Sequence, residues 1–356
     1  MSSDIERRNI MKKHEHYNQN SLDQLKAIEK SFSYIRLAVE THQTPFSPGL
    51  LVIADYGSSQ GANTLKAIRF IIDQLHQKYS QLLMRVPIVV VYNDLPANDW
   101  STLFRTVQQQ SSGAGFSLAA GQSFYHQILP FETLDFGFTS TSIHWLSELP
   151  LQIQNHCSFL FANDAELKIW QKQAANDYKI FLQHRSNELK KGGILLIVTL
   201  SRANDSSDLT CNHMLDMLYQ SALHMHSQNL ISDKELLAYN QCDYYRTLDE
   251  LTNQELLKEV NFECIKSETH RLTNPLYEQY QQGNITLHEF ARRYTEYVSS
   301  WNESSFRCCL IEKQRTENEK NALIKQFYAE HLRRVQLNPD YFAYNPQRSY
   351  IILRKL

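Results

Sequence analysis

The stretch LVIADYGSSQGANTL, which spans Leu51 to Leu65, decides the fold that we expect for this chain. The apolar run from Leu50 to Ala54 is typical of a short strand that is buried on both faces of a parallel sheet. Asp55, Gly57 and Gly61 follow this run. Glycine lets the backbone turn tightly and approach a bound molecule, so the turn predicts a ligand site at the carboxyl end of the strand.

The spacing of this turn is D-x-G-x-x-x-G, whereas the pyrophosphate site of a nicotinamide-dependent oxidoreductase has the spacing G-x-G-x-x-G. The carboxylate of Asp55 suits a cationic ligand better than a pyrophosphate. S-adenosylmethionine (SAM) is such a ligand, because it carries a sulfonium and an ammonium group. The turn therefore favours a SAM site over a dinucleotide site.

The next apolar stretch, PIVVVY from Pro87 to Tyr92, is followed at once by Asn93 and Asp94. We predict a second buried strand over this stretch. A carboxylate at the end of the strand beside the glycine turn can accept hydrogen bonds from both ribose hydroxyls of an adenosine. Asp94 is therefore our candidate for binding the ribose.

Other parts of the chain alternate between strand and helix patterns. Apolar runs predict a weaker strand over Leu134 to Phe138 and a strong one over Gly192 to Leu200. Helical spacing of apolar residues predicts helices over Ser21 to Glu40, Ala62 to Leu83 and Asn163 to Lys191. This alternation indicates an α/β protein with a parallel, doubly wound sheet.

The later part of the chain has a different character, because nine of the ten glycines precede Ile194. We expect helix after helix over Asp208 to Val298, lying over the strand ends. Arg307 to Glu312 and Ser349 to Arg354 are short apolar runs that we interpret as a closing pair of edge strands. The expected division is a core over residues 1–205, an α-helical cap over 206–300, and closing strands and helix over 301–356.

Composition excludes several classes of protein. The 36 Lys and Arg residues nearly balance the 38 Asp and Glu residues, giving a net charge of −2, so nucleic acid is not an expected partner. We find no apolar run of the roughly 18–20 residues that span a bilayer. Met1 to Lys13 has no apolar core of a secretory signal, and the six cysteines form no C-x-x-C pair. We expect reduced thiols, a cytoplasmic location and no membrane association.

Four motifs, found in order along the chain, resemble the SABATH family of plant methyltransferases. They are IADYGSSQGANTL, VYNDLPANDW, GQSFYHQILP and STSIHWLSELP, at residues 53–65, 91–100, 121–130 and 140–150. The family acts on salicylate, benzoate, jasmonate, indole-acetate and the xanthine alkaloids. The resemblance extends from about Tyr17 to Leu200, and then only Tyr239-Asn240 and Tyr244 resemble the family pattern F-N-x-P-x-Y.

The resemblance implies a class I SAM-dependent methyltransferase with a Rossmann-like sheet and an α-helical cap over its active site. Carried over residue by residue, it places the cofactor against Tyr17, Ser58, Asn63, Asp94, Leu95, Ser123 and Phe124, with Asp55 and Gly57 in the same turn. It places the substrate against Gln24, Thr141, His144 and Trp145. The substrate would be a small-molecule carboxylic acid, and the protein would be a homodimer.

Gln24 and Trp145 both carry hydrogen-bond donors, which the resemblance assigns to the substrate carboxylate. A carboxylate is already ionised at neutral pH, so we expect no catalytic acid or base. The chain also departs from the family pattern. Thr141 stands where a tyrosine is usual, and Leu237 stands where metal-binding members have an aspartate, so no metal is predicted.

Two histidine pairs, His14 with His16 and His224 with His226, are also not predicted to bind a metal. Alternatives to carboxyl methylation remain. Relatives that methylate xanthine nitrogens share the motif around His144 and Trp145, so the acceptor would then be nitrogen or another oxygen of a small heterocycle. An inactive paralogue that binds SAM without turnover is a third reading, motivated by Thr141 and by the altered N-terminal stretch.

Overall fold

A computed structural model describes residues 8–43, 49–80, 86–110, 115–203, 210–312, 315–343 and 345–356. Its centre is a seven-stranded sheet with the strand order β3-β2-β1-β4-β5-β7-β6. The strands are β1 (Leu51–Tyr56), β2 (Ile88–Asp94), β3 (Phe116–Gly121), β4 (Leu134–Ser140), β5 (Leu189–Leu200), β6 (Phe262–Arg271) and β7 (Gln347–Lys355).

Strands β1 to β5 pair in parallel, and β7 runs antiparallel between β5 and β6. The chain moves from β1 outward to β2 and β3, and then returns to the other side of β1 to form β4 and β5. The strand order therefore reverses between β1 and β4. In doubly wound sheets, ligands bind beyond the carboxyl ends of the strands at such a reversal.

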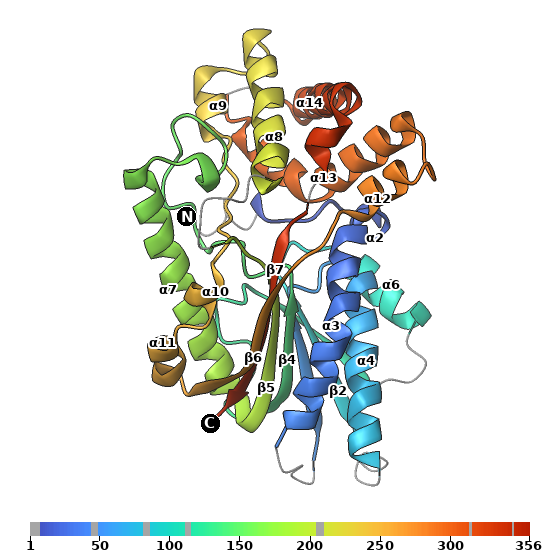
Figure 1. The fold of residues 1–356 in the computed structure, drawn as a ribbon, viewed down its shortest axis with the longest axis vertical. Helices are drawn as coiled ribbons and strands as arrows, with labels where there is room; N and C mark the ends of the chain where they lie inside the picture. The colour runs from blue at the N-terminus through green and yellow to red at the C-terminus, as the bar shows by residue number, and fades with distance from the viewer. Residues whose placement is uncertain are drawn as a thin grey trace.

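Helices cover both faces of the sheet and its carboxyl end (Figure 1). Helices α3 and α4 lie on one face, and α7 with α10 and α11 on the other. Helices α8, α9, α12, α13 and α14 gather beyond the strand ends. The helices are α2 (His16–Asn20), α3 (Leu22–Thr41), α4 (Ala62–Lys78), α6 (Trp100–Gln110), α7 (Asp164–Glu188), α8 (Thr210–Ser227), α9 (Asp233–Ala238), α10 (Leu248–Leu251), α11 (Gln254–Glu259), α12 (Pro275–Gln281), α13 (Leu287–Cys309) and α14 (Glu317–Leu337).

The apolar side chains of β5 explain why helices pack on both faces. Ile194, Leu196 and Val198 belong to the core that α3 and α4 cover, whereas Leu195 and Ile197 belong to the core that α7 covers. Successive side chains of a strand point to opposite faces, so a continuous apolar run produces two cores. A third core lies among the cap helices.

The doubly wound α/β fold is confirmed, and β1, β2, β4, β5 and β7 correspond to predicted strands. The prediction of continuous helices over Asp208 to Val298 is wrong, because β6 interrupts them, and β3 was not predicted. Both strands lie at the edges of the sheet, where much of the surface is exposed and the pattern is less apolar. Residues 208–209 lie outside the described residues.

The predicted edge strand over Arg307 to Glu312 is also wrong, because α13 continues to Cys309. Phe306 and Cys309 are buried three residues apart, and the side chain of Arg307 turns back to Glu303 at 3.4 Å. Both spacings are those of a helix. Helix α4 ends at Lys78, and residues 81–83 of the predicted helix lie outside the described residues.

The helices within the described ranges include none that is both long and apolar enough to cross a membrane. The division into a core, a cap and closing elements stays a prediction.

Candidate functional site

A cavity of about 380 Å³ lies at the carboxyl ends of β1, β2, β3 and β4. This volume falls within the usual range for a small-molecule site. Loops after these strands form one end of the cavity, and residues of α3, α8 and α13 close the other end. The cavity thus lies at the reversal of strand order, where the sequence placed the ligand site.

Gly57 sits in the turn after β1, where its backbone has a φ of +94°. A Cβ atom at this position would lie 2.1 Å from Oγ of Ser142, which no side chain tolerates. The Gly57 N–H donates to the carbonyl of Asn93 at 2.8 Å, so the turn is tied to the end of β2. Only glycine meets both requirements, the left-handed conformation and the close approach.

Asp94 ends β2 and lines the cavity. Its carboxylate accepts hydrogen bonds from the backbone N–H of Ser59 at 2.7 Å and of Leu95 at 2.8 Å. Burial raises the pKa of Asp94 to about 6, although these two hydrogen bonds act in the opposite direction. The backbone therefore fixes the carboxylate in place at the cavity wall.

Three of the predicted cofactor residues, Asp55, Ser58 and Asn63, are not among the described residues that line the cavity. Asp55 accepts a hydrogen bond from the hydroxyl of Thr64 at 2.8 Å, and burial raises its pKa to about 7. Ser58 Oγ donates to the carbonyl of Asp55 at 3.0 Å. Asn63 Nδ2 donates to Ser21 Oγ at 2.9 Å. These side chains lie behind the wall and shape the turn.

The other predicted cofactor residues, Tyr17, Leu95, Ser123 and Phe124, line the cavity. Tyr17 belongs to α2, and burial and the charge of Asp94 raise the pKa of its hydroxyl group. Ser123 and Phe124 follow β3, in a loop that the sequence placed near the cofactor. The cofactor-side residues therefore come together from α2 and from the loops after β2 and β3.

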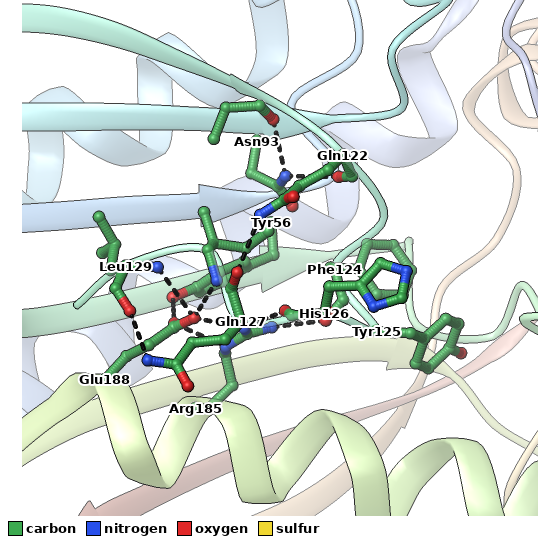
Figure 2. A network of polar contacts seen from close by, with 12 residues as sticks. Tyr56, Asn93, Gln122, Phe124, Tyr125, His126, Gln127, Leu129, Arg185 and Glu188 are labelled. Atoms are coloured by element: carbon green, nitrogen blue, oxygen red, sulfur yellow. Dashed lines mark hydrogen bonds and ion pairs between the residues drawn. The ribbon is translucent and has the colours of Figure 1, made fainter. Parts of the chain in front are cut away.

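The loop after β3 is held by a buried ion pair (Figure 2). Arg185 and Glu188 are both fully buried, and their side chains are 2.6 Å apart. Arg185 donates to the carbonyls of Phe124 at 2.7 Å and His126 at 2.9 Å. From the other side, Asn93 Nδ2 donates to the carbonyl of Gln122 at 2.8 Å. The position of Phe124 is thus set by its backbone anchors, which residue spacing alone did not reveal.

At the other end of the cavity, Gln24 of α3 meets Thr141, His144 and Trp145, which follow β4. Buried polar atoms of the first three, Gln24 Oε1, Thr141 Oγ1 and His144 Nδ1, have no hydrogen-bond partner among the described residues. Such atoms are costly to bury, and at a cavity wall they mark places where a ligand can bind. All four predicted substrate residues therefore lie in one place.

Thr141 has an unusual backbone conformation, and His144 has a shifted pKa. Thr141 has a φ of +55°, in the left-handed region that β-branched residues rarely adopt. Burial lowers the pKa of His144 to about 3, and the positive charges of Arg246 and Arg348 act in the same direction. His144 is therefore a neutral imidazole at physiological pH, and its ring lies tilted against that of Trp145, with the ring centroids 5.1 Å apart.

Several residues of the cavity wall were not predicted. They come mainly from the N-terminal stretch, from the cap and from segments near it, and include Asn9, Met11, Asp23, Asp177, Leu200, Met214, Asp243, Tyr245, Tyr297 and Trp301. Asp243 pairs with Trp145 in an isolated antiparallel bridge. The match at Tyr239-Asn240 and Tyr244 was the one sequence signal close to this segment.

The described residues contain no group of three or more His, Cys, Asp or Glu side chains arranged to hold a metal ion. His16 Nε2 lies 3.2 Å from Ser299 Oγ, and His226 pairs at 2.7 Å with Asp233. Leu237 lies on α9, as part of the cap. The prediction that the protein needs no metal stays a prediction.

Comparisons with known proteins identify the kind of chain. The sequence profile described as "SAM dependent carboxyl methyltransferase" matches residues 9–335. A benzoic acid/salicylic acid carboxyl methyltransferase of Petunia hybrida is 28% identical over 272 residues, which cover 72% of this chain and 76% of that protein. Salicylate carboxymethyltransferase of Clarkia breweri is 30% identical over 223 residues, which cover 60% of this chain and 61% of that protein.

Among solved structures, a loganic acid methyltransferase with bound S-adenosylhomocysteine superposes with a TM-score of 0.78. The superposition covers 97% of this chain and 98% of that chain, at 22% sequence identity. At this identity the likeness concerns the fold. The sheet order and the helices beyond the strand ends are therefore those of a known methyltransferase architecture.

Proposed function

The chain belongs to the SABATH family of SAM-dependent carboxyl methyltransferases, and from this premise we propose how its cavity is divided between cofactor and acceptor. The enzyme transfers a methyl group from SAM to the carboxylate of a small-molecule acid, giving a methyl ester and S-adenosylhomocysteine. We assign the loops after β1, β2 and β3 to the cofactor, and α3, the loop after β4 and the cap to the acid.

The residues of the cofactor end fit SAM. Gly57 forms the tight turn after β1 and lines the cavity, where its backbone is open to a ligand. Asp94 is buried and fixed, and its carboxylate oxygens have further lone pairs for the ribose hydroxyls. Phe124 offers an aromatic face to the adenine. When bound, SAM supplies a methyl group on a positively charged sulfur.

The acceptor end would orient the carboxylate. The Gln24 side-chain amide and the Trp145 indole N–H are donors on two elements that are far apart in sequence, and both line the cavity. We assign both to the substrate carboxylate. Thr141 carries a hydroxyl at the same end of the cavity, and His144 supports the wall as a neutral ring.

The chemistry needs little more than alignment. A lone pair of the carboxylate forms the new O–CH3 bond while the S–CH3 bond breaks and its electron pair stays on sulfur. Holding the carboxylate and the methyl group in line lowers the activation barrier by roughly 7–11 kcal/mol. Opposite charges disappear as the methyl group moves, so hydrogen-bond donors that orient the carboxylate serve better than a strong cation would. Gln24 and Trp145 are donors of this kind.

The convergence of Gln24 and Trp145 in one cavity is the observation that supports this assignment most strongly. The direct test is to incubate the protein with SAM labelled on its methyl group and a library of small acids, and to identify the products by mass spectrometry. We expect methyl esters. Products methylated on nitrogen would be compatible with the location of the acceptor site but would overturn the carboxylate assignment. Cofactor binding without any product would identify an inactive paralogue.

Three further expectations accompany this proposal. We propose a homodimer, which light scattering on the purified protein tests, and a cytoplasmic location, which imaging of the tagged chain tests.

Leu237 replaces the aspartate of metal-binding relatives, so methylation should persist at full rate in the presence of a chelator. Loss of activity that magnesium restores would contradict this expectation.

A further inference from the structure

The side chains that line the cavity include acidic groups but no basic ones of the Lys or Arg type among the described residues. Four aspartates line the cavity, namely Asp23, Asp94, Asp177 and Asp243. A negative wall suits a cofactor with a cationic sulfur but works against an acceptor that is itself an anion. The acid must therefore bring something that the wall attracts.

Three of these aspartates already have strong partners. Asp23 forms a buried ion pair with Arg348. Asp94 is bonded to two backbone N–H groups, as described above. Asp177 accepts hydrogen bonds from the backbone N–H of Ser147 at 2.8 Å and from its hydroxyl at 2.6 Å. Their negative charge is used within the protein.

Asp243 is different, because no ion pair among the described residues compensates its charge. It is 2% exposed, and Tyr245 donates one hydrogen bond to it. Its Oδ1 atom is buried and has no partner among the residues that the structure describes. Asp23 Oδ1 is also buried without a partner among these residues, but the guanidinium of Arg348 compensates the charge of Asp23. Burial raises the pKa of Asp243 to about 7, which shows how poorly the surroundings compensate its charge. A buried carboxylate oxygen without a donor is costly unless a ligand supplies one.

The position of Asp243 ties it to the acceptor. Residues 242–244 run beside residues 144–146, with hydrogen bonds from Leu146 N–H to Cys242 O and from Tyr244 N–H to His144 O, both at 2.8 Å. Asp243 and Trp145 are thus directly opposed, with Cβ atoms expected about 4.5–5.5 Å apart on the same side. Because the indole N–H lies farther from the backbone than the short Asp243 carboxyl, the two groups would contact different parts of one ligand.

We propose that Asp243 selects the acceptor, and that the acceptor is a carboxylic acid with a second group, a hydroxyl or a protonated amine, that donates a hydrogen bond to Asp243 Oδ1. This proposal rests on the proposed function, because it takes Trp145 as the partner of the carboxylate. Tyr245, Tyr297 and Trp301 line the same end, so the body between the two polar groups would be apolar.

The test compares acids that differ only in the donor. Hydroxybenzoates and aminomethylbenzoates, substituted at each ring position, are measured beside benzoate and the methoxybenzoates, whose oxygen cannot donate. The same set is built on any better scaffold that the acid library reveals. We expect at least one donor-bearing acid to exceed its methoxy counterpart in kcat/KM by about 10-fold or more, as for a hydrogen bond to a charged group.

The variant Asp243→Asn then tests whether Asp243 is the residue that accepts this hydrogen bond. We expect the variant to lower kcat/KM for the donor-bearing acid by about 10-fold or more, with a larger loss for an amine than for a hydroxyl. Because the substitution removes a negative charge near the acceptor carboxylate, we expect no loss of kcat/KM for benzoate and no loss of affinity for S-adenosylhomocysteine. Asp233→Asn is the matched control, because the Asp233 side chain is 94% exposed on α9. Thermal unfolding checks that each variant is folded.

Several results would overturn the proposal. Equal kcat/KM for donor-bearing and methoxy acids in the unmodified protein excludes a donor requirement, even where Asp243→Asn fails to fold. Equal losses for all acids would make Asp243 structural, and weaker binding of S-adenosylhomocysteine would assign it to the cofactor. If acids are methylated without any preference for a donor, only this proposal fails. If no acid is methylated at all, the proposed function fails as well.

Discussion

The two ends of the cavity differ in how their polar groups are satisfied. At the cofactor end, both carboxylate oxygens of Asp94 accept hydrogen bonds from the backbone. At the acceptor end, atoms of Gln24, Thr141, His144 and Asp243 are buried without a partner among the described residues. Asp94, the charged group of the cofactor end, has its partners before the ligand arrives, although Ser59 Oγ is buried there without one among the described residues. The acceptor end holds several polar atoms that a ligand would satisfy.

This difference matches what each end must do. Every member of a methyltransferase family uses the same cofactor, so an end whose carboxylate is already held in place loses nothing by being rigid. The acceptor varies, and recognition of a particular acid depends on polar groups that pair with it and reject acids lacking the right partner. We therefore expect substitutions at the cofactor end to weaken cofactor binding and those at the acceptor end to change substrate selectivity.

The largest effect is expected from Gly57→Ala at the cofactor end. The new Cβ atom would meet Ser142 Oγ at 2.1 Å, in a backbone conformation that alanine resists. We expect the affinity for S-adenosylhomocysteine, measured by calorimetry, to fall on the order of 100-fold. Gly283→Ala is the matched control, because Gly283 also has a positive φ but has open space around its Cβ position. Equal losses in both would show that backbone strain, and not the contact, matters.

A smaller loss at the same end is expected from Asp94→Asn. Removing the charge weakens hydrogen bonds from ribose hydroxyls, which are worth about 1.5–3 kcal/mol when the partner is charged. Calorimetry should show S-adenosylhomocysteine binding about 10- to 100-fold more weakly. Asp99→Asn, five residues along the same loop and outside the cavity lining, should bind normally. Unchanged affinity in a folded Asp94→Asn protein would refute the ribose assignment.

At the acceptor end, Trp145→Phe and Gln24→Leu should change turnover and leave the cofactor alone. Each removes one donor to the carboxylate and keeps most of the bulk, so we expect kcat/KM to fall about 10-fold or more. Affinity for S-adenosylhomocysteine should stay within error. Trp170→Phe controls for loss of an indole, since Trp170 of α7 is fully buried in the third core and its Nε1 has no partner among the described residues.

A double-mutant cycle sharpens this result. Both donors are assigned to one carboxylate, so the combined loss in the Gln24→Leu, Trp145→Phe protein should differ from the sum of the single losses. Strict additivity would place the two side chains on separate groups. Reduced cofactor affinity in either variant would instead assign that residue to the cofactor end and contradict the division of the cavity into two ends.

The two ends also differ in how far the sequence predicted them. The cofactor end depends on contiguous motifs. Gly57 and Asp94 could be named because a strand, a turn and the next strand impose their spacing, whereas Phe124 was named only through the family resemblance. Asp55, Ser58 and Asn63 belong to the same motif but lie behind the cavity wall. Motif spacing identifies the turn, and it does not distinguish residues that contact a ligand from those that support the turn.

The acceptor end was predicted only where it follows β4 and in α3. Met214, Asp243 and Trp301 reach the cavity through packing of the cap helices and the segment between them, over long sequence separations. Local periodicity carries no information about such contacts. The edge strands β3 and β6 were missed for a related reason, because a half-exposed strand lacks the apolar run by which β1, β2 and β5 were recognised.

The pH dependence of stability tests whether the two ends differ in hydrogen-bond partners or in burial. Asp55 lies behind the cofactor end and Asp243 at the acceptor end, and burial raises the pKa of each to about 7. A buried carboxyl with a raised pKa keeps its proton to higher pH in the folded protein than in the unfolded chain. Its contribution to stability is therefore complete below about pH 4 and is lost as the pH rises towards 7.

Asn cannot titrate, so Asp55→Asn and Asp243→Asn should each become more stable relative to the unmodified protein between pH 4 and pH 7, by up to about 1.4 kcal/mol per pH unit. Urea unfolding at several pH values measures this difference, and groups that titrate in all three proteins cancel. Similar slopes for both variants would mean that burial acts equally at the two ends, so that the supply of hydrogen-bond partners is what separates them. A flat difference for Asp243 alone would show that its carboxyl is compensated within the protein, and Oδ1 would then have no need of a donor from the acceptor.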